Sequence, residues 1–221
     1  MTTKQTATSA FIATLLLAIG SGCSSVTKAG RIDLSSQGTR PRAFEHTLVE
    51  GVYAVEESQS SFWFSDIPLE TLSSEPGTAP PDSVFTHVQL LWSPEPGRTP
   101  LSDSATNAVV RVVIVSKGEV GLYGGAAFAE HSGTIGADEV DLELRGGTLT
   151  LLTSTAGFVD PLTPAGFAAE LRARRSGEQA KAWRRAVSQI VTNATGRSTW
   201  VRSPSAIDAR AVISLARDHA R

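Results

Sequence analysis

Four histidines are the chain's clearest candidates for acid–base or metal chemistry, and none of them lies in a recognisable motif. They are His46, His87, His131 and His219. No two have the short spacing of paired metal ligands, and no H-E-x-x-H sequence occurs, so the sequence predicts no metal site and no cofactor. A catalytic site would have to assemble in space, with Asp66, Glu95 or Asp103 as the carboxylate partner of a histidine. A hydrolase built in this way is one alternative for the function.

Glycine-rich and serine motifs give no support to an enzyme. The chain lacks the G-x-S-x-G sequence that presents a serine nucleophile. The glycines of residues 118–125 do not have the spacing of a phosphate-binding loop, and the segment after them is too short for a crossover helix. We interpret residues 108–128 as a hairpin whose glycines allow close backbone packing.

A basic cluster lies where an alternating segment gives way to a helical one. Its members are Arg172, Arg174, Arg175, Lys181, Arg184 and Arg185. One interpretation is a surface that docks on anionic material, such as phospholipid headgroups or a cell-wall polymer. The other is cross-strand pairing with the acidic residues around Glu143, together with a solvated helix face. We favour the second interpretation.

Three aromatic residues on or beside expected strands are candidates for a pocket. Trp63, Trp92 and Tyr123 lie near two long loops rich in proline and serine, residues 73–83 and 93–106, and His87 lies on the strand between those loops. Together these four residues could line an apolar or sugar-binding pocket. Packing in the core is the more ordinary role for such side chains, and we favour it.

The only cysteine of the chain, Cys23, follows a short apolar run near the N-terminus. Residues 1–9 carry one lysine, residues 10–19 carry no charge, and small residues come next, which is the pattern of a secretory signal. The apolar run is shorter than the roughly 20 residues that a transmembrane helix needs. An exported protein with one cysteine has no internal disulfide partner for it.

Residues 1–25 resemble the signal of bacterial lipoproteins, whose lipobox ends in a cysteine. Ser21, Gly22 and Cys23 fit that motif, whereas Gly20 stands where the family usually has leucine. The resemblance implies a signal peptide over residues 1–22 and a lipidated Cys23 that anchors the mature chain in a membrane. It also implies a place in the cell envelope, in the outer membrane or at the periplasmic face. Without lipidation the protein would be secreted.

The composition of the mature chain predicts one globular domain that does not bind nucleic acid. About 198 residues remain after cleavage, which is enough for a single hydrophobic core. Lys4 lies in the signal, so 19 basic and 22 acidic residues leave a net charge of −3. A nucleic-acid-binding protein would need a dominant basic charge.

The residue pattern divides the mature chain into a tether and a domain. Residues 23–46 are polar and broken by glycine and proline, and we expect a lipidated cysteine followed by a flexible tether. Residues 47–221 should form one β-rich domain. Short apolar or alternating segments predict about seven to nine strands, in an antiparallel β-sandwich or a barrel-like sheet, with two C-terminal helices after it. The fold class is therefore mainly β or α+β.

Two local patterns are especially clear. Residues 139–145 and 148–154 alternate on either side of Gly146-Gly147, which predicts a hairpin with a two-residue turn. From residue 176 to residue 195 the apolar residues recur at helical spacing, with Ser176 and Gln179 as a capping box and Gly196 as the C-terminal stop. A second helix is expected over residues 205–219.

These observations favour an exported, lipid-anchored envelope protein with a non-enzymatic binding or scaffold role. Its expected partners are the membrane, through the N-terminal lipid, and another envelope protein or a cell-wall polymer. Two alternatives stay open: the envelope hydrolase described above, and a lipocalin-like carrier of an apolar ligand. The carrier requires a closed barrel with an empty interior.

Overall fold

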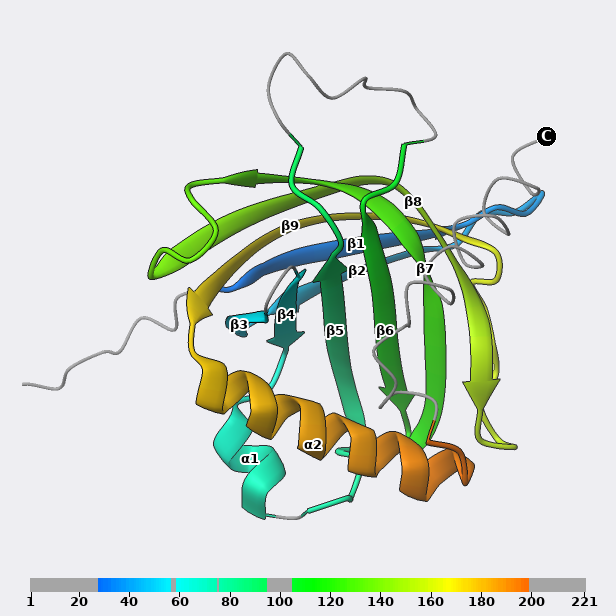
Figure 1. Cartoon of the computed structure of the whole chain (residues 1–221). Helices are drawn as coiled ribbons and strands as arrows, with labels where there is room; N and C mark the ends of the chain where they lie inside the picture. Colours follow the sequence, from blue (N-terminus) through cyan, green and yellow to red (C-terminus); the bar gives the residue numbers. More distant parts are fainter. Residues whose placement is uncertain (1–27, 57–58, 75, 95–104, 199–221) are drawn as a thin grey trace, which may run out of the picture.

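The computed structural model describes residues 28–56, 59–74, 76–94 and 105–198, and within them the chain forms nine strands and two helices (Figure 1). The strands are β1 (Gly30–Ser36), β2 (Ala43–Leu48), β3 (Glu50–Glu56), β4 (Gln59–Ser65), β5 (Asp82–Leu90), β6 (Ala108–Ser116), β7 (Glu119–Ser132), β8 (Glu139–Ser154) and β9 (Ala165–Arg175). The helices are α1 (Leu69–Ser74) and α2 (Gly177–Thr195). The predicted fold class, a mainly β protein whose sheet is followed by a helix, is confirmed. The second expected helix, over residues 205–219, lies outside the described residues.

All nine strands belong to one sheet that curls into a barrel-like ring. Their order is β2-β1-β9-β3-β4-β5-β6-β7-β8, and β8 also pairs with β9, which closes the ring. One edge of β9 is hydrogen-bonded to β8, and the other edge is shared between β1 and β3. The hairpin of β1 and β2 therefore joins the sheet beside the first half of β9, next to the ring.

The expected tether is wrong over residues 30–36 and 43–46, because these residues form β1 and most of β2. Ile32 and Leu34 are buried in the interior of the sheet, and β1 pairs with β9 from Gly30 to Ser36. The polar composition of the segment reflects its place at the edge of the sheet, where every second side chain meets water.

Alternation along the strands divides the core into an inner and an outer layer. On β4, Phe62 and Phe64 point into the ring, whereas Trp63 points outward beneath α2. Strand β6 is almost wholly apolar because both its faces are covered, as its sequence predicts: Val112 lies in the interior and Val113 lies against the helix layer.

The interior of the ring is filled by side chains. Tyr53, Phe62, Phe64 and Tyr123 are fully buried there, beside aliphatic residues from most of the strands. Small barrels and barrel-like sheets are commonly packed in this way, with side chains occupying the space that a carrier keeps for its ligand.

Helix α2 covers the outer layer. It lies along the lower ends of the strands in Figure 1 and packs against β3, β4 and β7. The hydroxyl of Ser176 caps its first turn by accepting the backbone N–H of Gln179, and Gly196 ends it in the left-handed conformation with φ of 66°. Both helix ends are where the sequence predicts them. Of the described helices, none is long and apolar enough to span a membrane.

The hairpin predicted at Gly146-Gly147 is wrong, because β8 runs through these glycines as one continuous strand. The pairing register of β8 shifts there against both neighbours, β7 and β9, which marks a β-bulge. Gly146 has φ of 59°, a conformation that suits a bulge as well as a turn. The hairpin predicted from residue 108 to residue 128 does form, with Lys117 and Gly118 at its turn.

Candidate functional site

The structure brings two of the four predicted pocket residues together. Trp63 on β4 lies directly opposite His87 on β5, and their rings stack with centroids 4.1 Å apart. Tyr123 lies in the interior, where its hydroxyl donates to Asp160 at 2.7 Å. Trp92 is exposed at a different place, against Phe128. Of the four residues predicted to line one pocket, the structure therefore brings only Trp63 and His87 together, and it places Tyr123 and Trp92 elsewhere.

The Trp63–His87 pair forms part of the wall of a cavity of about 210 Å³ beneath the first half of α2, which we call the α2 pocket. The charged residues that line it are Glu56, Arg111, Lys181 and Arg184. Ser61, Ala54, Val55, Gly177 and Ala180 complete the wall. The pocket thus joins the predicted aromatic site to Arg184 of the predicted basic cluster.

Arg111 is the basic residue of this pocket that the sequence analysis missed. It lies directly opposite His87 in the pairing of β5 with β6, and it is half-buried. The signal was present in the sequence, because Arg111 is the single charged residue in the apolar run of residues 108–115. A charge within a strand that is covered on both faces needs a polar environment, and the α2 pocket supplies it.

His87 is neutral in this setting. Burial, together with the positive charges of Arg111 and Arg184, lowers the pKa of its imidazole to about 3. The three side chains come from β5, β6 and α2, so the tertiary fold concentrates two guanidinium groups around an uncharged ring.

The pKa of His87 makes the protein's stability fall in acid. Between pH 6.5 and pH 3 the imidazole takes up a proton in the unfolded chain but not in the folded protein, so the free energy of unfolding decreases as the pH falls. We expect wild type to lose about 3 kcal/mol more than His87→Gln between pH 7 and pH 4. Urea unfolding of both proteins at the two pH values measures this difference, and equal losses would contradict it.

Most members of the predicted basic cluster are engaged within the sheet and helix. Arg172 donates to Asp141 at 2.6 Å across the β8–β9 pair, Arg174 to Gln179 at 3.1 Å and Arg175 to the carbonyl of Gly136 at 2.6 Å. Lys181 pairs with Glu178 along the helix at 3.3 Å, and Arg185 is exposed. This arrangement follows the cross-strand interpretation for Arg172, whereas Arg184 turns toward the α2 pocket.

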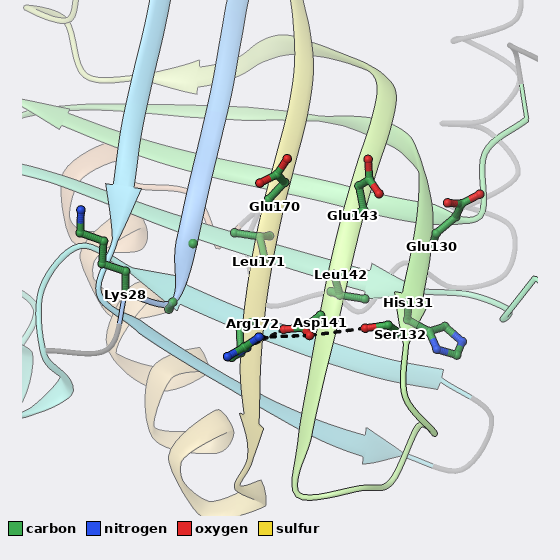
Figure 2. A pocket seen from close by; sticks show the side chains of 12 residues that line it. Lys28, Glu130, His131, Ser132, Asp141, Leu142, Glu143, Glu170, Leu171 and Arg172 are labelled. Carbon is green, nitrogen blue, oxygen red and sulfur yellow. Dashed lines mark hydrogen bonds and ion pairs between the residues drawn. The ribbon is translucent and has the colours of Figure 1, made fainter. Parts of the chain in front are cut away.

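A second hollow lies on the outer face of β7, β8 and β9 beside Lys28, and we call it the acidic groove (Figure 2). Glu130, Glu143 and Glu170 occupy matched positions on the three strands, so three carboxylates stand side by side. Arg145 lies 2.6 Å from Glu143 and 3.7 Å from Glu130, and its hydrogen bond lowers the pKa of the Glu143 carboxyl. The groove has a volume of about 470 Å³.

Arginine side chains offset the negative charge of the acidic groove. Carboxylates directly opposite one another on neighbouring strands repel, and Arg145 offsets that repulsion from the same surface. At the lower end of the groove, the Arg172 guanidinium lowers the pKa of Asp141 through their hydrogen bond. Within the described residues, no three histidine, cysteine or acidic side chains are grouped so that they could hold a metal ion.

One histidine does meet one of the three expected carboxylates. His46 Nε2 lies 2.7 Å from Asp66 Oδ2, and the other oxygen of Asp66 accepts the backbone N–H of Val84 at 3.0 Å. The carboxylate thus joins β2 to β5, and Phe44 stacks on the His46 ring. His131 instead contacts the carbonyl of Gly133 at 3.0 Å.

The remaining predicted site residues lie outside the described part of the chain. They are Cys23, Glu95, Asp103 and His219. The chain matches no protein-family model, no curated protein and no solved structure.

Proposed function

We propose that the protein is an exported envelope protein, anchored by a lipid on Cys23, with a non-enzymatic binding role at the membrane surface. The signal-like residues 1–22 and the single cysteine support export and anchoring. Its partner is another envelope protein or a cell-wall polymer close to the membrane.

The observation that carries this proposal is the early start of the sheet. Strand β1 begins at Gly30, only seven residues after Cys23. Ala29 is already held on both sides, because its N–H donates to Leu48 and its carbonyl accepts from Arg172. Seven residues span at most about 25 Å when fully extended. An anchored Cys23 would therefore hold the domain against the membrane, within reach of partners at that surface only.

The form of the domain favours binding at its outer face. The filled interior weighs against a carrier of apolar ligands, because Tyr53 and Tyr123 occupy the space that such a ligand would need. The His46–Asp66 pair comes nearest to a hydrolase site, but Asp66 also holds the backbone of β5, which gives the pair a structural role. The α2 pocket and the acidic groove both open on the outer face.

Replacing Cys23 with alanine tests the anchor. We expect the wild-type protein in its native envelope to begin at Cys23, to carry the added mass of acyl chains, and to fractionate with membranes. Several chains on one residue give stable anchoring, so Cys23→Ala should move most of the protein to the soluble fraction. Mass spectrometry and cell fractionation measure both effects.

The matched control is Ser24→Ala, which keeps the cysteine and changes the next residue. It should fractionate as wild type does. An unmodified wild-type mass, or membrane fractionation that persists in Cys23→Ala, would contradict the anchoring proposal.

A further inference from the structure

The outer face of the sheet carries a row of buried side chains beside the layer that α2 covers. Gln89 on β5, Val109 on β6 and Ala126 on β7 pair across these strands and are 3%, 4% and 3% exposed. Val109 and Ala126 belong neither to the interior of the ring nor to the layer beneath α2. Side chains on the outer face of a sheet are buried when another element packs on them, so this row calls for a further covering element.

The distance of this row from α2 suits a second helix packed beside the first. Phe85 lies beneath α2, and Gln89 lies four residues further along β5, which is about 13 Å along a strand. Packed helices lie about 8–10 Å apart. A helix beside α2 would therefore pass over the strip where His87 and Arg111 stand opposite each other, and it would cover the buried row at its far side.

The C-terminal segment of the chain starts where such a helix would have to start. Helix α2 crosses the sheet from β3 toward β7, and the described chain ends at Ser198, just after it (Figure 1). Residues 199–204 span at most about 21 Å, enough for a turn back toward the sheet. A helix over residues 205–219, which the sequence predicts, is about 22 Å long. That length recrosses β7, β6 and β5, whose neighbouring strands lie about 4.8 Å apart.

The residue pattern of the predicted helix directs one acid toward the sheet. At about 100° per residue, Arg210 and Arg217 share one side of a helix, and Val212 and Leu215 share the opposite side with Asp208. If the arginine side faces water, the apolar side packs on the sheet and carries Asp208 with it. A carboxylate buried in this way needs a cationic partner.

We propose that residues 205–219 form a second outer helix that docks on β5, β6 and β7 beside α2, with Asp208 paired to Arg111. Arg111 is the charged residue of the outer face of β6, it is half-buried, and it is engaged in an interaction within the protein. Docking closes the α2 pocket on the side away from α2. A partner that reaches the Trp63–His87 stack therefore has to displace the C-terminal segment, although the docking itself depends neither on the lipid anchor nor on a partner.

Hydrogen exchange of the full chain, purified in detergent, tests the docking. We expect the amides of residues 205–219 to exchange at least about 100-fold more slowly than in an unstructured peptide of the same sequence. An isolated helix of this length is marginal in water, so slow exchange reports contact with the sheet. Exchange at the unstructured rate would overturn the proposal. Protection that grows with protein concentration would also overturn it, because it would assign the face to a second copy of the chain.

Two matched variants test the orientation of the helix. Asp208→Arg brings a third cation to Arg111 and Arg184, and it should reduce the protection of residues 205–219 by about tenfold or more. Asp218→Arg makes the same change next to Arg217, toward the side that faces water, and should leave the protection as in wild type. Slow exchange of the β5, β6 and β7 amides checks that each variant is folded. Equal protection in the two variants would overturn the proposal.

A charge exchange tests the pairing itself. Combining Arg111→Asp with Asp208→Arg should return the protection of residues 205–219 to within about threefold of wild type, because the pair is restored with its signs reversed. A double variant with a folded sheet and an unprotected C-terminal segment would contradict the pairing. The lipid on Cys23 plays no part in these measurements, and Cys23→Ala should show the same protection, so failure of the anchoring proposal would be seen separately.

Discussion

Replacing Gly30 with alanine is expected to destabilise the protein by about 3 kcal/mol or more. Gly30 is the first residue of β1 and has φ of 134°, a conformation that side chains other than hydrogen rarely tolerate. A Cβ atom there would lie 2.1 Å from the backbone oxygen of Glu170 on β9. The substitution therefore forces β1 away from β9. Urea unfolding, followed by circular dichroism, measures the loss in the free energy of unfolding.

Gly38→Ala is the matched control for this experiment. Gly38 lies in the connection between β1 and β2, and a Cβ atom at this position would meet no heavy atom within 4 Å. Its effect on stability should stay within about 0.5 kcal/mol. If Gly30→Ala were equally harmless, residues 30–36 would be the flexible tether that their composition suggests, and the argument for a short link to the proposed anchor would fail.

Replacing Trp183 with alanine should cost about 3 to 5 kcal/mol. The Trp183 side chain is 1% exposed and lies between α2 and the outer face of the sheet, with its ring centroid 6.1 Å from that of Phe85. Its removal leaves a cavity that the rigid sheet cannot close. Chemical denaturation measures the loss, and proteolysis of α2 should become faster because the helix is held mainly by this buried face.

Arg185→Ala is the control on the same helix, two residues further along. Arg185 is exposed, and its replacement should change stability by less than about 0.5 kcal/mol. Equal effects of the two substitutions would contradict the view that α2 is held by its apolar face, because alanine favours the helix equally well at both positions.

The sequence predicts correctly those strands and helices whose structure is decided by residues that lie close together in the chain. The alternation of residues 166–175 reflects one buried and one wet face, and β9 has that burial pattern. Helix α2 begins after its N-terminal cap, Ser176, and ends before its C-terminal cap, Gly196, as the sequence predicts. In both cases the side chains that decide the structure lie within a few residues of one another.

The two wrong predictions about the fold concern features that distant strands decide. Ile32 and Leu34 give β1 only two buried apolar side chains, too few for a strand signal, and the pairing with β9 makes the strand. Gly146-Gly147 suits either a turn or a bulge. Strands β7 and β9 on either side of β8 select the bulge, and neither is adjacent to these glycines in sequence.

The candidate site was predictable only in parts. Simple alternation places Trp63 on the opposite face of β4 from Phe62 and Phe64, and the structure shows that its face is the outer one. That His87 lies beside it depends on the register of β4 with β5, and that Arg111 and Arg184 meet there depends on where α2 packs. Neither the register of β4 with β5 nor the position of α2 follows from the spacing of residues in the sequence. The pocket is therefore visible only in the three-dimensional structure.

The split edge of β9 has a consequence for the order in which the chain can fold. Strand β9 is the last of the described strands to be synthesised, and β1, β3 and β8 all hydrogen-bond to it. Until residues 165–175 have emerged, the first strands have no complete sheet to join, and the ring stays open. Contacts between the two ends of a chain slow folding, because a long loop must close first. The ring of the newly made chain should therefore stay open until synthesis is almost complete, which would suit the export proposed above.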